Sequence, residues 1–219
     1  HRRSGEDLLM KGHIRKATVA LAAASVLGFV GCSGSSAEPS PADPTETLQM
    51  SADYPVYNTL DEAGDAAGTI VRGKFLDSRV ELLYPDTSPD SGDGLSNPQS
   101  GVPSEQITPS DMAVVATVSR LEVTEALKGD ARVGDVIEVI QPGGEYEQVK
   151  YTEEKTVPLS DISSSDILLF LDLMPDGHYD LINPEQGLYT VNGDALTPVT
   201  DENSLGLKTL AQARETASK

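Results

Sequence analysis

Apolar and polar residues alternate along much of the chain after residue 50, and this pattern predicts a sheet. The clearest stretch is 112–145, which contains a long predicted strand followed by turn residues at 127–130. A second strand is predicted over 135–141, before a tight turn at 142–144. This pair of strands is the part of the chain around which we expect the fold to be built.

The long strand changes phase partway along. Apolar residues at 114, 116 and 118 share one face, whereas those at 121 and 123 share the other. A β-bulge at Ser119-Arg120 would produce such a slip, and bulges bend a strand around a barrel corner. The sequence therefore favours a closed or strongly bent sheet.

Further strands follow from composition and turn signals. The continuous apolar run at 166–173 predicts a strand buried on both faces, and the polar segment 146–157 predicts an edge strand or a loop. Pro175-Asp176-Gly177 and Asn192-Gly193 predict two hairpin turns. The remaining predicted strands cover residues 69–77, 79–84, 178–183, 188–191 and 195–199.

Helix signals are confined to the two ends of this region. Thr59 and Glu62 fit a capping box at the start of a helix over 60–67. Ser204 can cap a second helix that continues to Thr216. With so little helix between strands, we predict a mainly β fold: a small antiparallel barrel or sandwich with a short N-terminal helix and a C-terminal helix.

The N-terminal region predicts export and attachment to a membrane. A basic segment after Met10 precedes the apolar run 17–30, which is short for a bilayer span but suits a signal peptide. The residues Phe29-Val30-Gly31-Cys32 resemble a bacterial lipobox, although Phe29 departs from the usual leucine. This resemblance implies cleavage between Gly31 and Cys32, lipidation of Cys32, and anchoring on the extracellular side of the cell membrane.

The predicted organisation has four parts. Residues 1–9 precede the signal peptide and look non-native or mis-annotated, and residues 10–31 form the signal peptide. Residues 32–50 comprise the lipidated cysteine and a disordered Pro-rich tether, and residues 51–219 form a single β-rich domain.

The charge is strongly negative. Of 35 acidic and 16 basic residues, only two acids but five bases precede Cys32, so the remainder carries 33 acids against 11 bases. Such a surface repels phosphate backbones, and we therefore expect no nucleic-acid partner. An unknown envelope protein, a small ligand or a cationic group fits this charge.

A Pro-, Ser- and Asp-rich insertion is predicted over 85–110. Asp86, Asp90 and Asp93 suggest calcium, but Ser91 occupies the place of the EF-hand glycine and no glutamate closes the loop. These aspartates are weak metal candidates, and no cofactor is predicted.

Several stretches carry a family resemblance: TIVRGKF at 69–75, VTEALKG at 123–129, GDVI at 134–137, PGG at 142–144 and LLFL at 168–171. They resemble uncharacterised surface lipoproteins of Gram-positive, actinobacterial-type bacteria. More distantly, the chain is similar to the netrin-like modules of metalloproteinase inhibitors, which implies an OB-like barrel. Protease inhibition does not carry over, because the chain lacks their cysteine framework.

No catalytic constellation is evident in the sequence. His178 is the single histidine after residue 13, it follows a predicted turn, and no G-x-S-x-G motif supplies a nucleophile. The segment Gly143-Gly144-Glu145-Tyr146 exposes backbone and an aromatic ring, and is a candidate binding edge. The leading hypothesis is a lipid-anchored extracytoplasmic binding module that is not an enzyme; the alternative is an envelope hydrolase using acidic residues, with or without a divalent metal.

Overall fold

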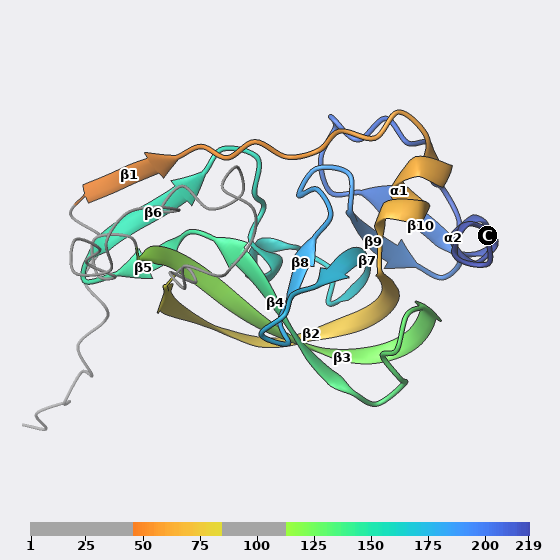
Figure 1. Ribbon diagram of the computed structural model, residues 1–219, viewed down its shortest axis with the longest axis horizontal. Helices are drawn as coiled ribbons and strands as arrows, with labels where there is room; N and C mark the ends of the chain where they lie inside the picture. The colour runs from red at the N-terminus through yellow and green to blue at the C-terminus, as the bar shows by residue number, and fades with distance from the viewer. Residues whose placement is uncertain (1–45, 85–112) are drawn as a thin grey trace, which may run out of the picture. The chain divides into compact units, whose positions relative to one another are not determined.

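The computed structural model describes residues 46–84 and 113–219, and these ranges are mainly β (Figure 1). The strands are β1 (Glu46–Met50), β2 (Thr69–Leu83), β3 (Val114–Lys128), β4 (Val136–Pro142), β5 (Gly144–Tyr146), β6 (Val149–Glu153), β7 (Asp166–Leu173), β8 (Tyr179–Leu181), β9 (Leu188–Asn192) and β10 (Ala195–Pro198). The helices are α1 (Leu60–Ala66), α2 (Leu210–Ala217) and the 3-10 turn η3 (Leu159–Asp161).

Five strands close into a ring. The order is β7-β2-β3-β4-β8, and β8 pairs again with β7. Within the ring only β4 and β8 run parallel, through Val139 opposite Tyr179 and Ile140 opposite Asp180. The predicted antiparallel barrel is thereby confirmed, and a five-stranded ring is what an OB-like fold requires.

The interior of the ring is apolar. Side chains from every strand of the ring meet there, including Val71, Leu121, Val139, Leu169 and Tyr179. These side chains occupy one face of each strand, because successive residues of a strand point to opposite sides. This core holds β4 and β8 in place and thereby fixes which side chains of those strands face outwards.

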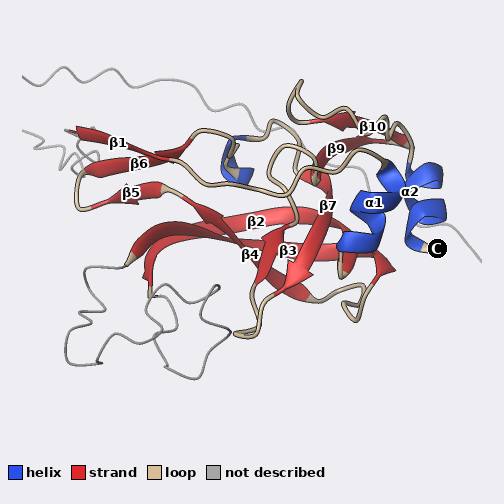
Figure 2. Ribbon diagram, turned by 45° about the horizontal axis from the view of Figure 1, so that its top comes forward, coloured by secondary structure: helices blue, strands red, loops and turns tan. Residues whose placement is uncertain are grey.

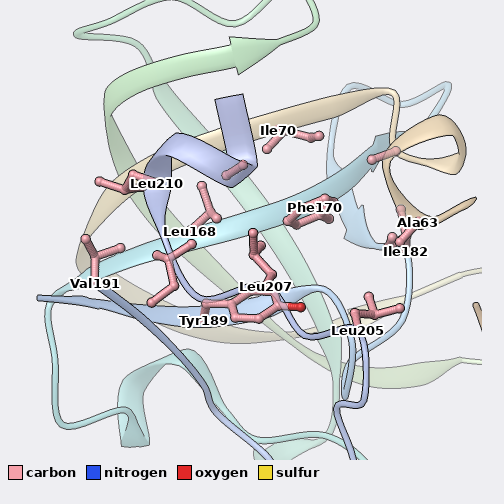
Figure 3. Close-up of a cluster of buried hydrophobic side chains, with 13 residues drawn as sticks. Ala63, Ile70, Leu168, Phe170, Ile182, Tyr189, Val191, Leu205, Leu207 and Leu210 are labelled. Carbon is pink, nitrogen blue, oxygen red and sulfur yellow. The ribbon is translucent and has the colours of Figure 1, made fainter. Parts of the chain in front are cut away.

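A second core lies on the outside of β7. Leu168 and Phe170 point away from the ring and pack with Tyr189 and Leu207 (Figure 3). Because Ile167, Leu169 and Leu171 fill the ring, β7 is buried on both faces, as its continuous apolar run predicts. The second core also receives Ala63 of α1 and Leu210 and Ala213 of α2.

Both helices have capped N-termini. Thr59 accepts a hydrogen bond from the Glu62 amide, 3.1 Å away, so the predicted first helix is confirmed. The second helix begins at Leu210, with Thr209 and Gln212 forming the capping box. The predicted start at Ser204 is wrong, because Leu205 and Leu207 enter the second core in an irregular segment, with a positive φ at Gly206, before the helix begins.

A smaller sheet has the order β1-β6-β5 (Figure 2). β1 pairs in parallel with β6, so residues 46–50 belong to the folded unit and the predicted tether extends too far. β6 has a strand on each side, so assigning 146–157 to a sheet edge or a loop is wrong for residues 149–153. The composition of β1 does not predict a strand, because its first four residues are exposed and show no buried face.

The pairing of β2 with β3 contains three register shifts. One leaves Leu76 of β2 as an extra residue, between Phe75 opposite Leu121 and Asp77 opposite Arg120, and the other two leave Thr124 and Leu127 of β3 as extra residues. β3 pairs with β4 across Ser119 and Arg120 with no shift, so the predicted bulge is not at these two residues; the shift next to them inserts Leu76 on the partner strand. Between Val115 and Ser119 both faces of β3 contain buried residues, and this explains the phase change without an inserted residue at that point.

Candidate binding site

The predicted binding edge lies where the chain passes from the barrel to the small sheet. β4 ends at Pro142 and β5 begins at Gly144, so residues 142–144 continue the strand and the predicted tight turn is wrong. The turn comes later, at Glu147 and Gln148, whose φ angles are +51° and +68°. Two consecutive positive φ angles are what a two-residue hairpin of the primed type requires.

This edge lines a hollow of about 520 Å³, which we call the glycine-edge hollow. Gly143, Gly144 and Glu145 belong to its lining, whereas Tyr146 does not. A Cβ atom on Gly144 would lie 2.7 Å from Val80 Cγ2 and 2.9 Å from Thr117 Oγ1. The glycine is therefore needed for the close approach of the two sheets, and the edge exposes less backbone than its sequence suggests.

A second hollow, the apolar groove, lies on the outer face of β3, β4 and β8. Its volume is about 340 Å³. Ala116 pairs with Pro142 and Ile140 pairs with Asp180, so their side chains share the outward face. Tyr54 and Pro55, from the segment between β1 and α1, complete the lining.

Asp180 is the single ionisable carboxyl group in the lining of the apolar groove. Burial, reinforced by the negative charges of Asp176 and Asp172, raises its pKa above the usual 3.8. No Lys, Arg or His of the described ranges lies within ion-pair distance of it. The groove therefore holds an acid that has no ion-pair partner in the described chain and whose raised pKa the nearby His178 offsets only in part.

Glu153 lies in the wall of the glycine-edge hollow and is only 6% exposed. Its Oε2 atom accepts hydrogen bonds from the Lys155 amide at 3.0 Å and the Thr156 hydroxyl at 2.8 Å. Its Oε1 atom is buried and has no partner of good hydrogen-bond geometry among the residues described. The Tyr54 phenol nevertheless interacts with the carboxylate closely enough for this contact to raise the pKa of the phenol. A carboxylate oxygen in this state has capacity for one further donor.

The two hollows share a wall. Gln141, Pro142 and Thr156 line both of them. Gln141 is held by hydrogen bonds of 2.9 Å to the Val157 carbonyl and from the Leu159 amide. Since the wall is fixed by buried hydrogen bonds, the hollows are formed before any ligand arrives.

Tyr54 connects the two carboxylates. Burial raises the pKa of its phenol, and the negative charge of Glu153 and, more weakly, of Asp180 adds to this shift. The pKa of this hydroxyl therefore depends on the charges of both acids. The Nζ atom of Lys155 lies 6.0 Å from the centre of the Tyr54 ring.

His178 lines a third hollow, of about 460 Å³, beside the β7–β8 turn. Its Nε2 atom lies 3.2 Å from Glu138 Oε2, and its Nδ1 atom lies 3.3 Å from Asp176 Oδ2. Glu138 is in turn bound by Arg79, and the hydrogen bond from this guanidinium holds the pKa of Glu138 below 4.5. His178 follows the turn at Gly177 as predicted, but its side chain is only 24% exposed and contacts two acids.

The other predicted site residues lie outside the described ranges: Gly31 and Cys32 at the predicted lipidation site, and Asp86, Asp90 and Asp93 in the predicted insertion. Across residues 46–84 and 113–219, no three His, Cys, Asp or Glu side chains are grouped as a metal site would require. Nor does any helix of these two ranges have the length and apolarity to cross a membrane.

Sequence reasoning missed Asp180 and Glu153. Asp180 is one of many acids, and only the β4–β8 pairing places it among apolar side chains. Glu153 sits in a polar segment whose burial depends on β1 pairing beside it. Comparison with known proteins gives no match among protein-family models, curated proteins or solved structures.

Proposed function

We propose that this chain is a lipid-anchored extracytoplasmic binding module that holds a small ligand in the apolar groove. The observation that carries the proposal is the groove itself, which is formed by fixed strands and lined mainly by apolar side chains. Its volume of about 340 Å³ is suited to a small molecule. A few polar groups at its rim, among them Tyr54 and Thr156, can orient such a ligand.

The location of the module rests on the sequence. The apolar run before Cys32 and the lipobox-like residues 29–32 support export followed by acylation of the cysteine thiol. The acidic surface supports a role away from nucleic acid. The resemblance to Gram-positive surface lipoproteins and to netrin-like modules supports the same proposal.

Anchoring is tested by partition of the native protein between detergent and aqueous phases. We expect the exported wild-type chain in the detergent phase and the Cys32→Ser variant in the aqueous phase. Recovery of the wild type from the aqueous phase, with residues before Cys32 still attached, would overturn the lipid anchor.

Groove binding is tested with n-hexanol, added to the full chain produced without lipid processing. We expect saturable chemical-shift changes at groove residues, and loss of binding in Ile140→Phe, whose ring would fill the groove. Val136→Phe is the matched control, because Val136 lies on the outward face of the same strand and does not line the groove. Equal binding by both variants, or none by the wild type, would overturn the groove as the site.

A hydrolase is the second candidate, favoured by one observation: the raised pKa of Asp180 in a pocket. A carboxyl group with a raised pKa is a better candidate for a general acid than an ordinary aspartate. The test is release of chromophore from neutral nitrophenyl esters and glycosides, compared between wild type and Asp180→Asn. Turnover lost in this variant would support hydrolysis, and equal rates with and without protein would remove it.

A further inference from the structure

We propose that the apolar groove takes ligands that carry a protonated amine on an apolar stem, with Asp180 as the counter-charge and Glu153 Oε1, in the wall of the adjoining hollow, as a further acceptor. This inference rests on the proposed function, since it names the ligand class of the same groove. It follows from three features of the site: the charge of the lining, the unused acceptor and the shape of the apolar wall.

The charge of the lining selects the ligand's head group. Asp180 is the single charged side chain among the residues that line the groove, and its carboxylate forms no ion pair in the described chain. Removing a carboxylate from water without a partner is costly, and a cation placed beside it recovers much of that cost. A ligand ammonium would therefore gain more at this position than a hydroxyl or a carboxylate.

Glu153 gives independent support. It is more than nine-tenths buried, it lines the hollow that shares Gln141 and Thr156 with the groove, and its Oε1 atom has no described partner of good hydrogen-bond geometry. Buried polar atoms in folded proteins nearly always have a partner. Because this atom is closed off from solvent, a ligand donor reaches it from the groove only when the neighbouring Tyr54 phenol moves aside.

The apolar wall selects the stem. Ala116, Ile140 and Pro142 come from adjacent strands and present a continuous outward face, which Val114 extends, and Leu181 also lines the groove. Burying a methylene group there contributes about 0.8 kcal/mol. A short alkyl or aryl stem can occupy this wall while its ammonium group stays at Asp180.

Besides His178, whose electrostatic interaction lowers the pKa of Asp180, Lys155 is a group that could compete. Its ammonium lies over the Tyr54 ring. Within the described residues, it forms no ion pair with Glu153 or Asp180. Its backbone amide, not its side chain, binds Glu153. The Lys155→Gln variant should therefore bind an amine at least as tightly as the wild type.

The test compares n-hexylamine, n-hexanol and n-hexanoate at neutral pH, by calorimetry on the full 219-residue chain produced without lipid processing. We expect the amine to bind about ten- to a hundredfold more tightly than the alcohol, the range of a charge-assisted hydrogen bond. Asp180→Asn should reduce this preference to less than about threefold, and Glu153→Gln should reduce it in part.

Asp172→Asn is the matched control, because Asp172 lies opposite Asp180 on β7 and does not line the groove. It should keep the amine preference. Equal affinity for amine and alcohol, or tightest binding of hexanoate, overturns this inference and leaves the binding function standing. Equal losses in the Asp172 and Asp180 variants overturn it as well, because the effect would then be one of net charge. Binding of none of the three probes overturns both proposals.

Discussion

Asp172 and Asp180 stand directly opposite each other on the antiparallel strands β7 and β8. Like charges in this position repel, and such pairs are destabilising. Asp172 is exposed and its Oδ1 atom accepts a hydrogen bond of 3.0 Å from the Leu173 amide. Asp180 has no comparable relief, because it faces the apolar groove. A residue that lowers the stability of the fold and yet lines a pocket is typical of a functional site, where function as well as stability determines the sequence.

This arrangement predicts that Asp180→Asn stabilises the fold. The folded state raises the pKa of Asp180, so it favours the protonated acid relative to the unfolded chain. The resulting penalty is fully present above the folded pKa and is relieved as the pH falls through that value towards 3.8. We expect a gain of about 0.5 to 1 kcal/mol in the free energy of unfolding at neutral pH.

Urea denaturation at neutral pH and near pH 3 measures this effect. The gain should vanish at the acidic end, where both states carry the protonated acid. Asp172→Asn should give a smaller gain, because Asp172 is exposed. A loss of stability in Asp180→Asn at neutral pH would contradict the assignment of Asp180 as an acid whose charge is compensated only in part.

The Arg79–Glu138 pair predicts the opposite pH dependence. Two hydrogen bonds of 2.6 and 3.0 Å join the guanidinium to the carboxylate, and the pKa of Glu138 is lowered mainly for this reason. Its contribution to stability is therefore present above pH 4.5 and is lost as the pH falls through the folded pKa. Since both side chains are partly exposed, Arg79→Gln should cost less than about 1 kcal/mol at neutral pH.

Carboxyl chemical shifts followed through an acid titration measure this pair directly. Arg79→Gln should move the Glu138 titration to higher pH. Arg214→Gln, which removes the equivalent bidentate partner of Glu125, should leave Glu138 unchanged and move Glu125 instead. An unmoved Glu138 titration in Arg79→Gln would mean that the pair does not persist in solution.

How far the sequence predicts the structure depends on how local each signal is. The apolar run of β7, the turn at Gly177 and the Thr59 cap depend on neighbouring residues, and all three are found where predicted. β1 and β6 are polar strands that are stable through pairing with each other, and residue-level patterns carry little of that information. The bulge at Leu76 is visible only as a mismatch between two strands, so the sequence of β3 alone misplaces it.

The site was harder to predict than the fold because it depends on register. Ile140 and Asp180 become neighbours only when β4 and β8 pair in parallel, 40 residues apart along the chain. The glycines at 143 and 144, predicted as part of a binding edge, line a hollow, and the structural need for Gly144 is steric. They allow two sheets to approach, and the exposed backbone proposed from the sequence is not their main role.

Replacing Phe170 measures how much the second core contributes to the stability of the fold. Its side chain is fully buried, and its ring centre lies 6.1 Å from that of Tyr189 in a tilted arrangement. Phe170→Ala should cost about 3 to 5 kcal/mol of unfolding free energy, from lost apolar burial and the cavity left behind. Leu173→Ala on the same strand is the control and should cost less than about 1 kcal/mol, because Leu173 is 49% exposed. Similar midpoints in thermal or urea unfolding for the two variants would contradict this core.

Replacing Gly144 should cost stability through a steric collision as well as through backbone strain. The same substitution at Gly177 measures the backbone strain alone. Gly144 and Gly177 have φ angles of +135° and +92°, so a Cβ atom is unfavourable at both positions. At Gly177 the added atom would meet nothing within 4 Å, whereas at Gly144 it would meet Val80 and Thr117 at under 3 Å. We expect Gly177→Ala to cost about 1 kcal/mol and Gly144→Ala about 2 to 4 kcal/mol.

Hydrogen exchange measured on both variants shows which elements lose protection. In Gly144→Ala the loss of protection should concentrate in β5 and β6, because the collision lies where the small sheet meets β2 and β3. In Gly177→Ala it should stay near the β7–β8 turn. Equal destabilisation by the two substitutions would show that the sheets can separate at little cost, and the hollow beside Gly144 would then not be a fixed feature of the fold.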